Sequence, residues 1–281
     1  MPARSFFLNP RKLTYAMKKK QILLTNDDGI GSPGLWAAAS VLAELGQVTV
    51  VAPDAAYSHF ARGFNKNASG RIQRISKEVD GRQWEAFAVD GSPSQTVMHA
   101  VLEIMPVKPD LLVSGINYGE NVCIDVTTSG TVGAAYEGAT FGIPSLATSL
   151  QILEEEWDTF HEIDFSMAAH FTRLFAKKML KTPLPFDVDM INMSVPVNAT
   201  TRTPWRMTRL ARSRYYDPYV IRHDGWESKA KLTAHRLVDD SLTADTDIYT
   251  LIKDGLVAVT PLSLDVTSRV KLDELDQLLR K

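Results

Sequence analysis

The sequence predicts an α/β protein whose mostly parallel sheet is covered by helices on both faces. Continuous apolar runs of strand length alternate with segments of helical spacing, which is typical of parallel sheets buried on both sides. The chain has 281 residues, 44% of them hydrophobic, so it can bury a large core without disulfides or a structural metal. This length suits one large domain with an appendage.

The first half of the chain contains three apolar runs that predict strands. We expect strands at 21–25, 48–52 and 110–114, a turn at 26–29, and helices at 33–45 and 93–105. Ser92 is the candidate N-cap of the second helix. Residues 1–16 are predicted to be an N-terminal extension, and Met17 is a candidate first residue of the native protein.

The alternation continues to about residue 197 and then changes. Helices are expected at 131–141 and 164–181, and strands at 145–149 and 190–194. Residues 200–250 are rich in arginine and aromatic side chains and predict an extended, hairpin-rich arm. A strand at 255–260 and a charged helix at 267–280 follow. The predicted organisation is an extension (1–16), a core (17–199), an arm used in oligomerisation (200–250) and a closing strand and helix (251–281).

Composition argues against several classes of function. The formal net charge is −2, so no overall basic field draws the chain to a nucleic-acid polymer or to an anionic membrane. No apolar run reaches the roughly 18 residues of a membrane helix. Cys123 is the single cysteine, which excludes an internal disulfide framework and a multi-cysteine metal site and favours a cytoplasmic location.

Two adjacent carboxylates, Asp27 and Asp28, follow the first predicted strand. At the end of a buried strand they repel each other unless a cation or hydrogen bonds stabilise them. Carboxylate oxygens are hard ligands that suit Mg²⁺ or Mn²⁺. The alternative is an ordinary strand-to-helix turn, for which Asn, Asp and Gly are favoured residues.

Three further turns are oxygen-rich or glycine-rich. Ser58 follows a Pro-Asp turn. The segment 114–121 offers amide oxygens, and its glycines leave room for a ligand to approach the backbone closely. The helix start near Ser129 is a potential anion site. Each also has a structural interpretation, as a turn or as close helix packing. Together they predict a divalent-cation site beside an anion-binding helix start, which is an arrangement for handling phosphate. The dinucleotide fingerprint and the P-loop motif are absent after these strands, which argues against redox and ATPase chemistry.

The order of these motifs resembles the SurE family of survival-protein nucleotidases. The resemblance rests on Ile22–Ile30, Val51–Ser58, Ser114–Gly119 and Ser129–Gly138, and it resumes at Ile191–Pro196, Ala244–Asp247 and Thr260–Leu262. It implies a Rossmann-like core and a divalent-metal-dependent phosphatase acting on nucleoside monophosphates at the 5′ or 3′ position. It also implies exchange of C-terminal segments in a homodimer or homotetramer.

The resemblance also implies the site residues. One Mg²⁺ or Mn²⁺ per subunit is expected at Asp27, Asp28, Ser58 and Asn117, and the two aspartates are expected to be catalytic. Water held by the metal would attack phosphorus, with Asp27 as direct base or nucleophile being the alternative. The residues expected to contact the substrate or its phosphate are Asn26, Asn65, Gly115, Ser129, Gly130 and Thr131.

Some positions depart from the family's usual pattern. Gln95 and Thr96 stand where the family usually has Asp and Cys, and residues 62–67 replace a Gly-x-Ser-x-Thr stretch. A broad-specificity acid phosphatase or exopolyphosphatase, and a nucleotide-binding protein with reduced catalysis, are therefore alternative functions. His59 is either a substrate contact or an exposed loop histidine. The arm's arginines and aromatic residues could cap a nucleobase or phosphate, although a subunit interface is their expected use.

Overall fold

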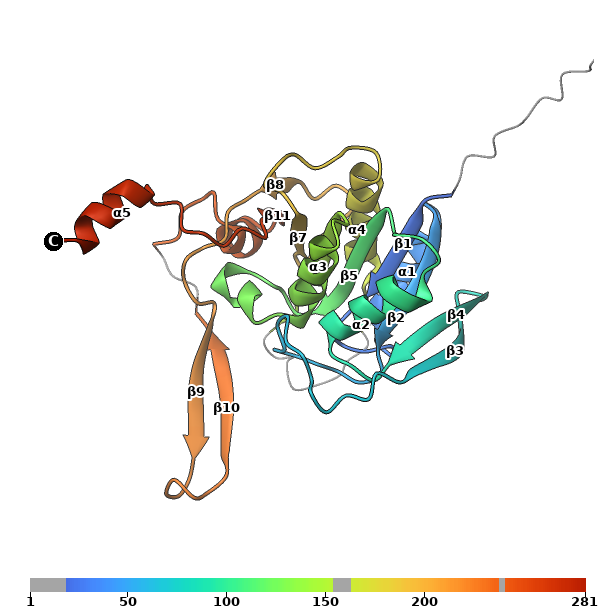
Figure 1. Ribbon diagram of the computed structural model, residues 1–281, viewed down its shortest axis with the longest axis horizontal. Coiled ribbons are helices and arrows are strands. Elements are labelled where there is room, and N and C mark those ends of the chain that lie inside the picture. The colour runs from blue at the N-terminus through green and yellow to red at the C-terminus, as the bar shows by residue number, and fades with distance from the viewer. Residues whose placement is uncertain (1–18, 154–162, 238–240) are drawn as a thin grey trace, which may run out of the picture.

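The computed structural model describes residues 19–153, 163–237 and 241–281. The expected extension 1–16 and the candidate start Met17 lie outside these ranges. Within them, nine strands form one sheet in the order β3-β4-β2-β1-β5-β6-β7-β11-β8, and two more form a separate hairpin (Figure 1). In the same ranges, no helix combines the length and the apolar character that crossing a bilayer requires.

Most neighbouring strands of the sheet are parallel, as the sequence predicts. The exceptions are β3, which runs antiparallel to β4, and β11, which runs antiparallel to β7. The strands of the sheet are β1 (Gln21–Thr25), β2 (Gln47–Pro53), β3 (Ile72–Val79), β4 (Arg82–Val89), β5 (Leu111–Tyr118), β6 (Ser145–Leu150), β7 (Met190–Val195), β8 (Trp205–Met207) and β11 (Val257–Leu262).

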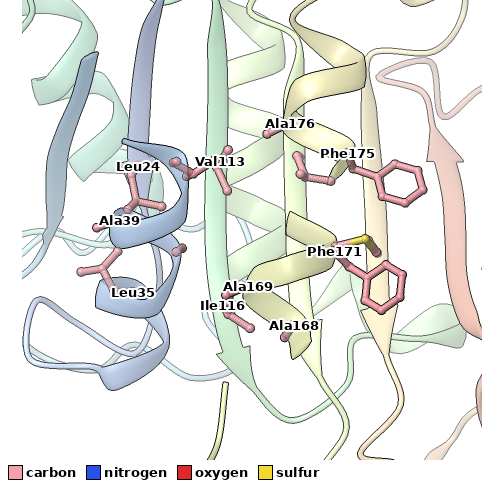
Figure 2. Close-up of a cluster of buried hydrophobic side chains, with 14 of the residues drawn as sticks. Leu24, Leu35, Ala39, Val113, Ile116, Ala168, Ala169, Phe171, Phe175 and Ala176 are labelled. Carbon is pink, nitrogen blue, oxygen red and sulfur yellow. The ribbon is translucent and has the colours of Figure 1, made fainter. Parts of the chain in front are cut away.

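Helices cover both faces of the sheet. On one face lie α1 (Pro33–Leu42) and α4 (Ser166–Met179); on the other lie α2 (Pro93–His99), extended by one wide turn at Ala100–Ile104, and α3 (Gly130–Thr140). Successive residues of β1 point to opposite cores: Leu24 packs with α1 and α4, whereas Leu23 packs with α2 and α3. Figure 2 shows the first core, in which side chains of α1 and α4 meet those of β1 and β5.

The sheet reverses its direction of growth between β1 and β5. From β1 the chain proceeds to β2 and β4 on one side, and then returns to place β5, β6 and β7 on the other. In open α/β sheets, ligands bind beyond the carboxyl ends of the strands at such a switch point. The predicted cation-binding residues lie after β1, after β2 and at the end of β5, which are neighbouring strands, so the topology places them together.

The structure contains a hairpin that was not predicted from the sequence. Strands β3 and β4 form an antiparallel hairpin at one edge of the sheet. Its turn is Asp80-Gly81, and both residues have positive φ, which is the geometry that favours Asp-Gly in two-residue hairpins.

The predicted hairpin in the arm is confirmed. Strands β9 (Tyr216–Arg222) and β10 (Ala230–Arg236) pair only with each other and project from the body of the molecule (Figure 1). Another part of the predicted arm does not project: β8, which lies within 200–250, joins the main sheet as its last strand beside β11. The final helix, α5 (Leu272–Leu279), is shorter than the expected 267–280 and lies apart from the sheet.

Candidate functional site

The structure brings the four predicted metal-binding side chains to one pocket of about 650 Å³. Asp27 and Asp28 come from the turn after β1, Ser58 from the loop after β2, and Asn117 from the end of β5. Ser129, at the start of α3, lines the same pocket. The volume is within the usual range for a small-molecule site.

Asp27 is held by the first turn of α3. The hydroxyl of Thr131 donates to Asp27 Oδ1 and also lies 3.0 Å from Asn117 Oδ1. A Cβ built on Gly130 would lie 2.7 Å from the Asp27 side chain, so only glycine allows this approach. Gly130 and Thr131, expected to contact phosphate, are therefore in contact with the Asp27 carboxylate, and Thr131 is fully buried.

The negative charge of Asp28 is stabilised by fewer hydrogen bonds than that of Asp27. The hydrogen bond to its carboxylate comes from the Tyr118 N–H at 3.3 Å. Burial, followed by the charge of Asp27, raises the pKa of Asp28 to about 7. Burial also raises the pKa of Asp27, against the hydrogen bonds from Thr131. The pair is thus a local excess of negative charge that a cation would relieve.

The donor set fits a hard divalent cation. Two carboxylates, the Ser58 hydroxyl and the Asn117 amide offer oxygen ligands of the kind that Mg²⁺ and Mn²⁺ prefer. In the described ranges, no three His, Cys, Asp or Glu side chains cluster closely enough to bind a metal by themselves. A site at this pocket therefore depends on the neutral oxygens of Ser58 and Asn117 as well as on the carboxylates.

A glycine in β5 places Asn117 at the pocket. The register between β5 and β6 shifts between Ser114 and Asn117, and Gly115 has a φ of +130°. A Cβ on Gly115 would lie 2.3 Å from the Thr148 carbonyl oxygen. The close approach expected at Gly115 is therefore made to the neighbouring strand, and Gly115 is not among the described residues that line the pocket.

Two asparagines that were expected at the substrate, Asn26 and Asn65, make hydrogen bonds within the loops beside the pocket. Asn26 is fully buried; its amide donates to the Gly29 carbonyl at 3.0 Å, and its Oδ1 has no hydrogen-bond partner among the described residues. Asn65 donates to the Tyr57 hydroxyl at 3.1 Å. Neither asparagine is among the described lining residues. Both hold the turns that carry the pocket residues.

Ser129 caps α3 at the edge of the pocket. Its Oγ accepts from the Val132 N–H at 3.1 Å, and Thr128 beside it also lines the pocket. The positive end of the α3 dipole therefore faces the region of the two aspartates, where it favours an anion.

Gln95, a departure from the expected pattern, has a structural function in this chain. Its Oε1 accepts from the Ser92 N–H at 3.0 Å, which completes a capping box at α2, and from the Asn65 N–H at 2.9 Å. Its amide donates back to the Asn65 carbonyl at 3.3 Å. Gln95 thus fastens the loop that carries Ser58 to the start of α2.

The other wall of the pocket is formed by residues that the sequence suggested only as alternative substrate contacts, such as His59 and the arm, and by others that it did not suggest. His59 lines it, and so does the base of the arm; the lining residues outside the predicted set include Glu120, Asp125, Arg214, Tyr216, Pro218, Leu232, Thr233 and Ala234. The mixture of arginine and aromatic residues in the arm was the available signal. Its expected use was a subunit interface, whereas the structure places the hairpin base against the pocket.

Comparisons with known proteins identify the family. The family described as survival protein SurE matches residues 22–217, which include all four predicted metal-binding positions. A Thermococcus gammatolerans protein named 5′-nucleotidase SurE is 40% identical over 92% of this chain and 96% of its own length. A protein of the same name from Methanocella arvoryzae is 37% identical over 92% and 98%. The crystal structure of the SurE protein from Aquifex aeolicus superposes with a TM-score of 0.70 at 31% identity, covering 93% of this chain and 100% of that chain.

Proposed function

The chain belongs to the survival protein SurE family, and on this premise we propose that it is a metal-dependent 5′-nucleotidase that hydrolyses nucleoside monophosphates. The observation that supports this best is the convergence of Asp27, Asp28, Ser58 and Asn117 beside the start of α3. It combines an oxygen-rich cation site with a helix terminus suited to phosphate.

In this proposal, the four side chains hold one Mg²⁺ or Mn²⁺ per subunit. When bound, the cation polarises the phosphoryl group and lowers the pKa of a bound water. The protein's own contribution is to orient the ligands: Thr131 fixes the Asp27 carboxylate and the Asn117 amide, and Gly130 allows α3 to approach them. Ser129 and Thr128 lie where they can bind phosphoryl oxygens as charge develops.

A substrate panel tests the proposed function. Phosphate release is measured from 5′- and 3′-nucleoside monophosphates, p-nitrophenyl phosphate and polyphosphate, each with Mg²⁺, Mn²⁺ or a chelator. We expect release from nucleoside 5′-monophosphates that depends on the metal and is largely lost in Asp28→Asn. Nucleotide binding without turnover would support the binding-protein alternative, and preference for p-nitrophenyl phosphate or polyphosphate would support the broad phosphatase.

Trapping experiments decide how phosphorus is attacked. We propose attack by water, so quenched reactions with radiolabelled substrate should contain no phosphoprotein. A phospho-aspartate at Asp27 would instead establish it as the nucleophile, which is the alternative that the sequence left open.

We also propose that the protein acts in the cytoplasm as a homodimer or homotetramer. Cys123 is a free and buried thiol, as expected for a chain that does not depend on disulfides. The projecting β9–β10 hairpin and the helix α5, none of whose residues is buried, offer surface for assembly.

A further inference from the structure

The first residue of β9 and the last residue of β10 both contact one buried residue, Glu120. Tyr216 begins β9, Arg236 ends β10, and the two are directly opposite each other in the ladder. The Tyr216 hydroxyl donates to the Glu120 carbonyl at 3.2 Å, and an Arg236 guanidinium nitrogen lies 3.0 Å from Glu120 Oε1. Glu120 is only three residues beyond Asn117, so this contact links the hairpin to the strand end that carries a predicted metal ligand.

Further contacts surround Glu120 at this junction. The Tyr215 hydroxyl donates to Glu120 Oε1 at 2.8 Å, and the Arg236 guanidinium lies 5.7 Å from the centroid of the Tyr215 ring. Asp125 Oδ2 accepts from the backbone N–H groups of Tyr215 and Tyr216, at 2.8 and 3.1 Å. Glu120 is 2% exposed. A buried ion pair with this many hydrogen bonds specifies one arrangement of the groups that it joins.

The hairpin base is also a wall of the pocket. Tyr216 and Pro218 from β9, and Leu232 to Ala234 from β10, line the same pocket as the two aspartates. Leu232 is 73% exposed although it borders a cavity, so an apolar or aromatic ligand group would bury it. Among the described lining residues, Arg214 alone carries a permanent positive charge, and a guanidinium can stack on a planar ring.

We propose that Glu120 and Arg236 are positioning residues that hold the hairpin base as the nucleoside-facing wall of the pocket. This inference rests on the proposed function and deepens it: the cation site and α3 take the phosphate, and the hairpin base takes the nucleoside. The pair then sets the preference for nucleotides over small phosphomonoesters, because small esters do not reach the hairpin. Neither residue takes part in the bond-breaking step.

The test compares a nucleotide with a small ester. Kinetics with AMP and with p-nitrophenyl phosphate are measured for the wild type, Arg236→Met, and Glu120→Gln/Arg236→Met, which removes both charges and leaves no unpaired buried ion. We expect KM for AMP to rise about tenfold in both variants, with kcat for AMP and kcat/KM for p-nitrophenyl phosphate within about twofold of wild type. The unchanged reaction with p-nitrophenyl phosphate shows that the variants are folded.

Asp217→Asn is the matched control. Asp217 pairs with His235 at 3.5 Å, one step further along the same hairpin, and both side chains are about half exposed, at 47% and 52%. This variant should leave KM for AMP unchanged. An unchanged KM for AMP in the double variant would overturn the proposal, and so would an equal loss with both substrates, because that result indicates only general destabilisation.

A binding measurement that does not depend on catalysis tests the role of Glu120 and Arg236 separately from the proposed nucleotidase activity. The Kd of AMP is measured by calorimetry in the presence of a chelator, and we expect it to be about tenfold weaker in the double variant. If the wild type releases no phosphate from any nucleotide, the proposed function fails. The comparison of Kd values still decides the inference, because equal values would refute it.

Discussion

At the scale of single residues, the two carboxylates after β1 oppose stability while they prepare a binding site. Asp27 and Asp28 are adjacent, and burial raises the pKa of each. The folded protein therefore retains protons that the unfolded chain releases as the pH rises from about 4 towards 7. In this window the stability of the metal-free protein falls with rising pH, since the folded state binds more protons.

Asp28→Asn should remove much of this pH dependence. In chelator-treated protein at pH 7.5 we expect the variant to be more stable than wild type by up to about 4 kcal/mol, and the difference to shrink towards pH 4.5. Urea unfolding at the two pH values measures it. Mn²⁺ should raise the Tm of wild type and leave that of the variant nearly unchanged. Equal stabilisation of both proteins by Mn²⁺ would contradict the ligand assignment.

Removing the Gln95 side chain should weaken both the fold and the metal site. Gln95→Ala leaves the N–H groups of Ser92 and Asn65 without their acceptor, which costs about 1–3 kcal/mol. Because the loop from Ser58 to Asn65 loses both of its hydrogen bonds to the Gln95 side chain, metal affinity should also fall. Thermal unfolding and a Mn²⁺ titration measure these effects. Ser76→Ala, which affects a weak 3.4 Å bond to Gln83 on the distant β3–β4 hairpin, should change neither quantity.

At the scale of elements, the contact between α3 and the end of β1 determines the geometry of the site. Gly130 begins α3 directly against the Asp27 side chain, and Thr131 follows with its hydroxyl on the same carboxylate. The small residues of this helix therefore have a local purpose, because they bring a helix start and a carboxylate into contact. The helix-packing interpretation of this segment is therefore supported by the structure, and the anion site at the helix start stays a prediction.

Gly130→Ala should disturb this contact. The new Cβ would meet the Asp27 side chain at 2.7 Å, so the carboxylate or the helix must move. We expect at least about a tenfold loss of metal affinity with a Tm lowered by a few degrees. Gly31→Ala is the control, since its Cβ has nothing within 4 Å and should be neutral. Wild-type metal affinity in Gly130→Ala would show that the contact is not needed for binding.

At the scale of the whole molecule, the sequence predicted those features that depend on local pattern. The buried strands were visible as apolar runs, and α1, α2, α3 and α4 as periodic segments between them. The β3–β4 hairpin was missed because polar and charged residues interrupt both strands, so that neither forms the continuous apolar run by which the other strands were identified, and β3 lies at the edge of the sheet. The Asp80-Gly81 turn was the signal that could have identified it.

The site was predictable for a similar reason. Asp27, Asp28, Ser58 and Asn117 follow strand ends, and parallel strands bring their ends to one edge, so their meeting in one pocket follows from topology. The contact of Glu120 with Tyr215 and Arg236 joins positions 95 and 116 residues apart. It depends on where the arm folds back, which no local pattern specifies. The orientation of Thr131 towards Asp27 likewise depends on packing.

The exposed face of α5 is a candidate surface for subunit assembly. The leucines of α5 gather on one side of the helix, and Leu272 and Leu279 are 66% and 76% exposed. If this face joins subunits, Leu272→Ser/Leu279→Ser should lower the mass measured by light scattering. Gln277→Ser, on the opposite side of the helix, should leave it unchanged. An oligomer that is unaffected by the double variant would show that α5 is not at the interface.

The position of the hairpin in the chain has an evolutionary consequence. It is inserted between β8 and β11, which pair with each other in the main sheet, whereas in the described residues β9 and β10 form a ladder only with each other. Its outer portion can therefore lengthen, shorten or change sequence without altering the register of the sheet or the geometry of the aspartates. The same modularity makes the tip, at Asp224 and Gly225, the natural place to graft a reporter peptide.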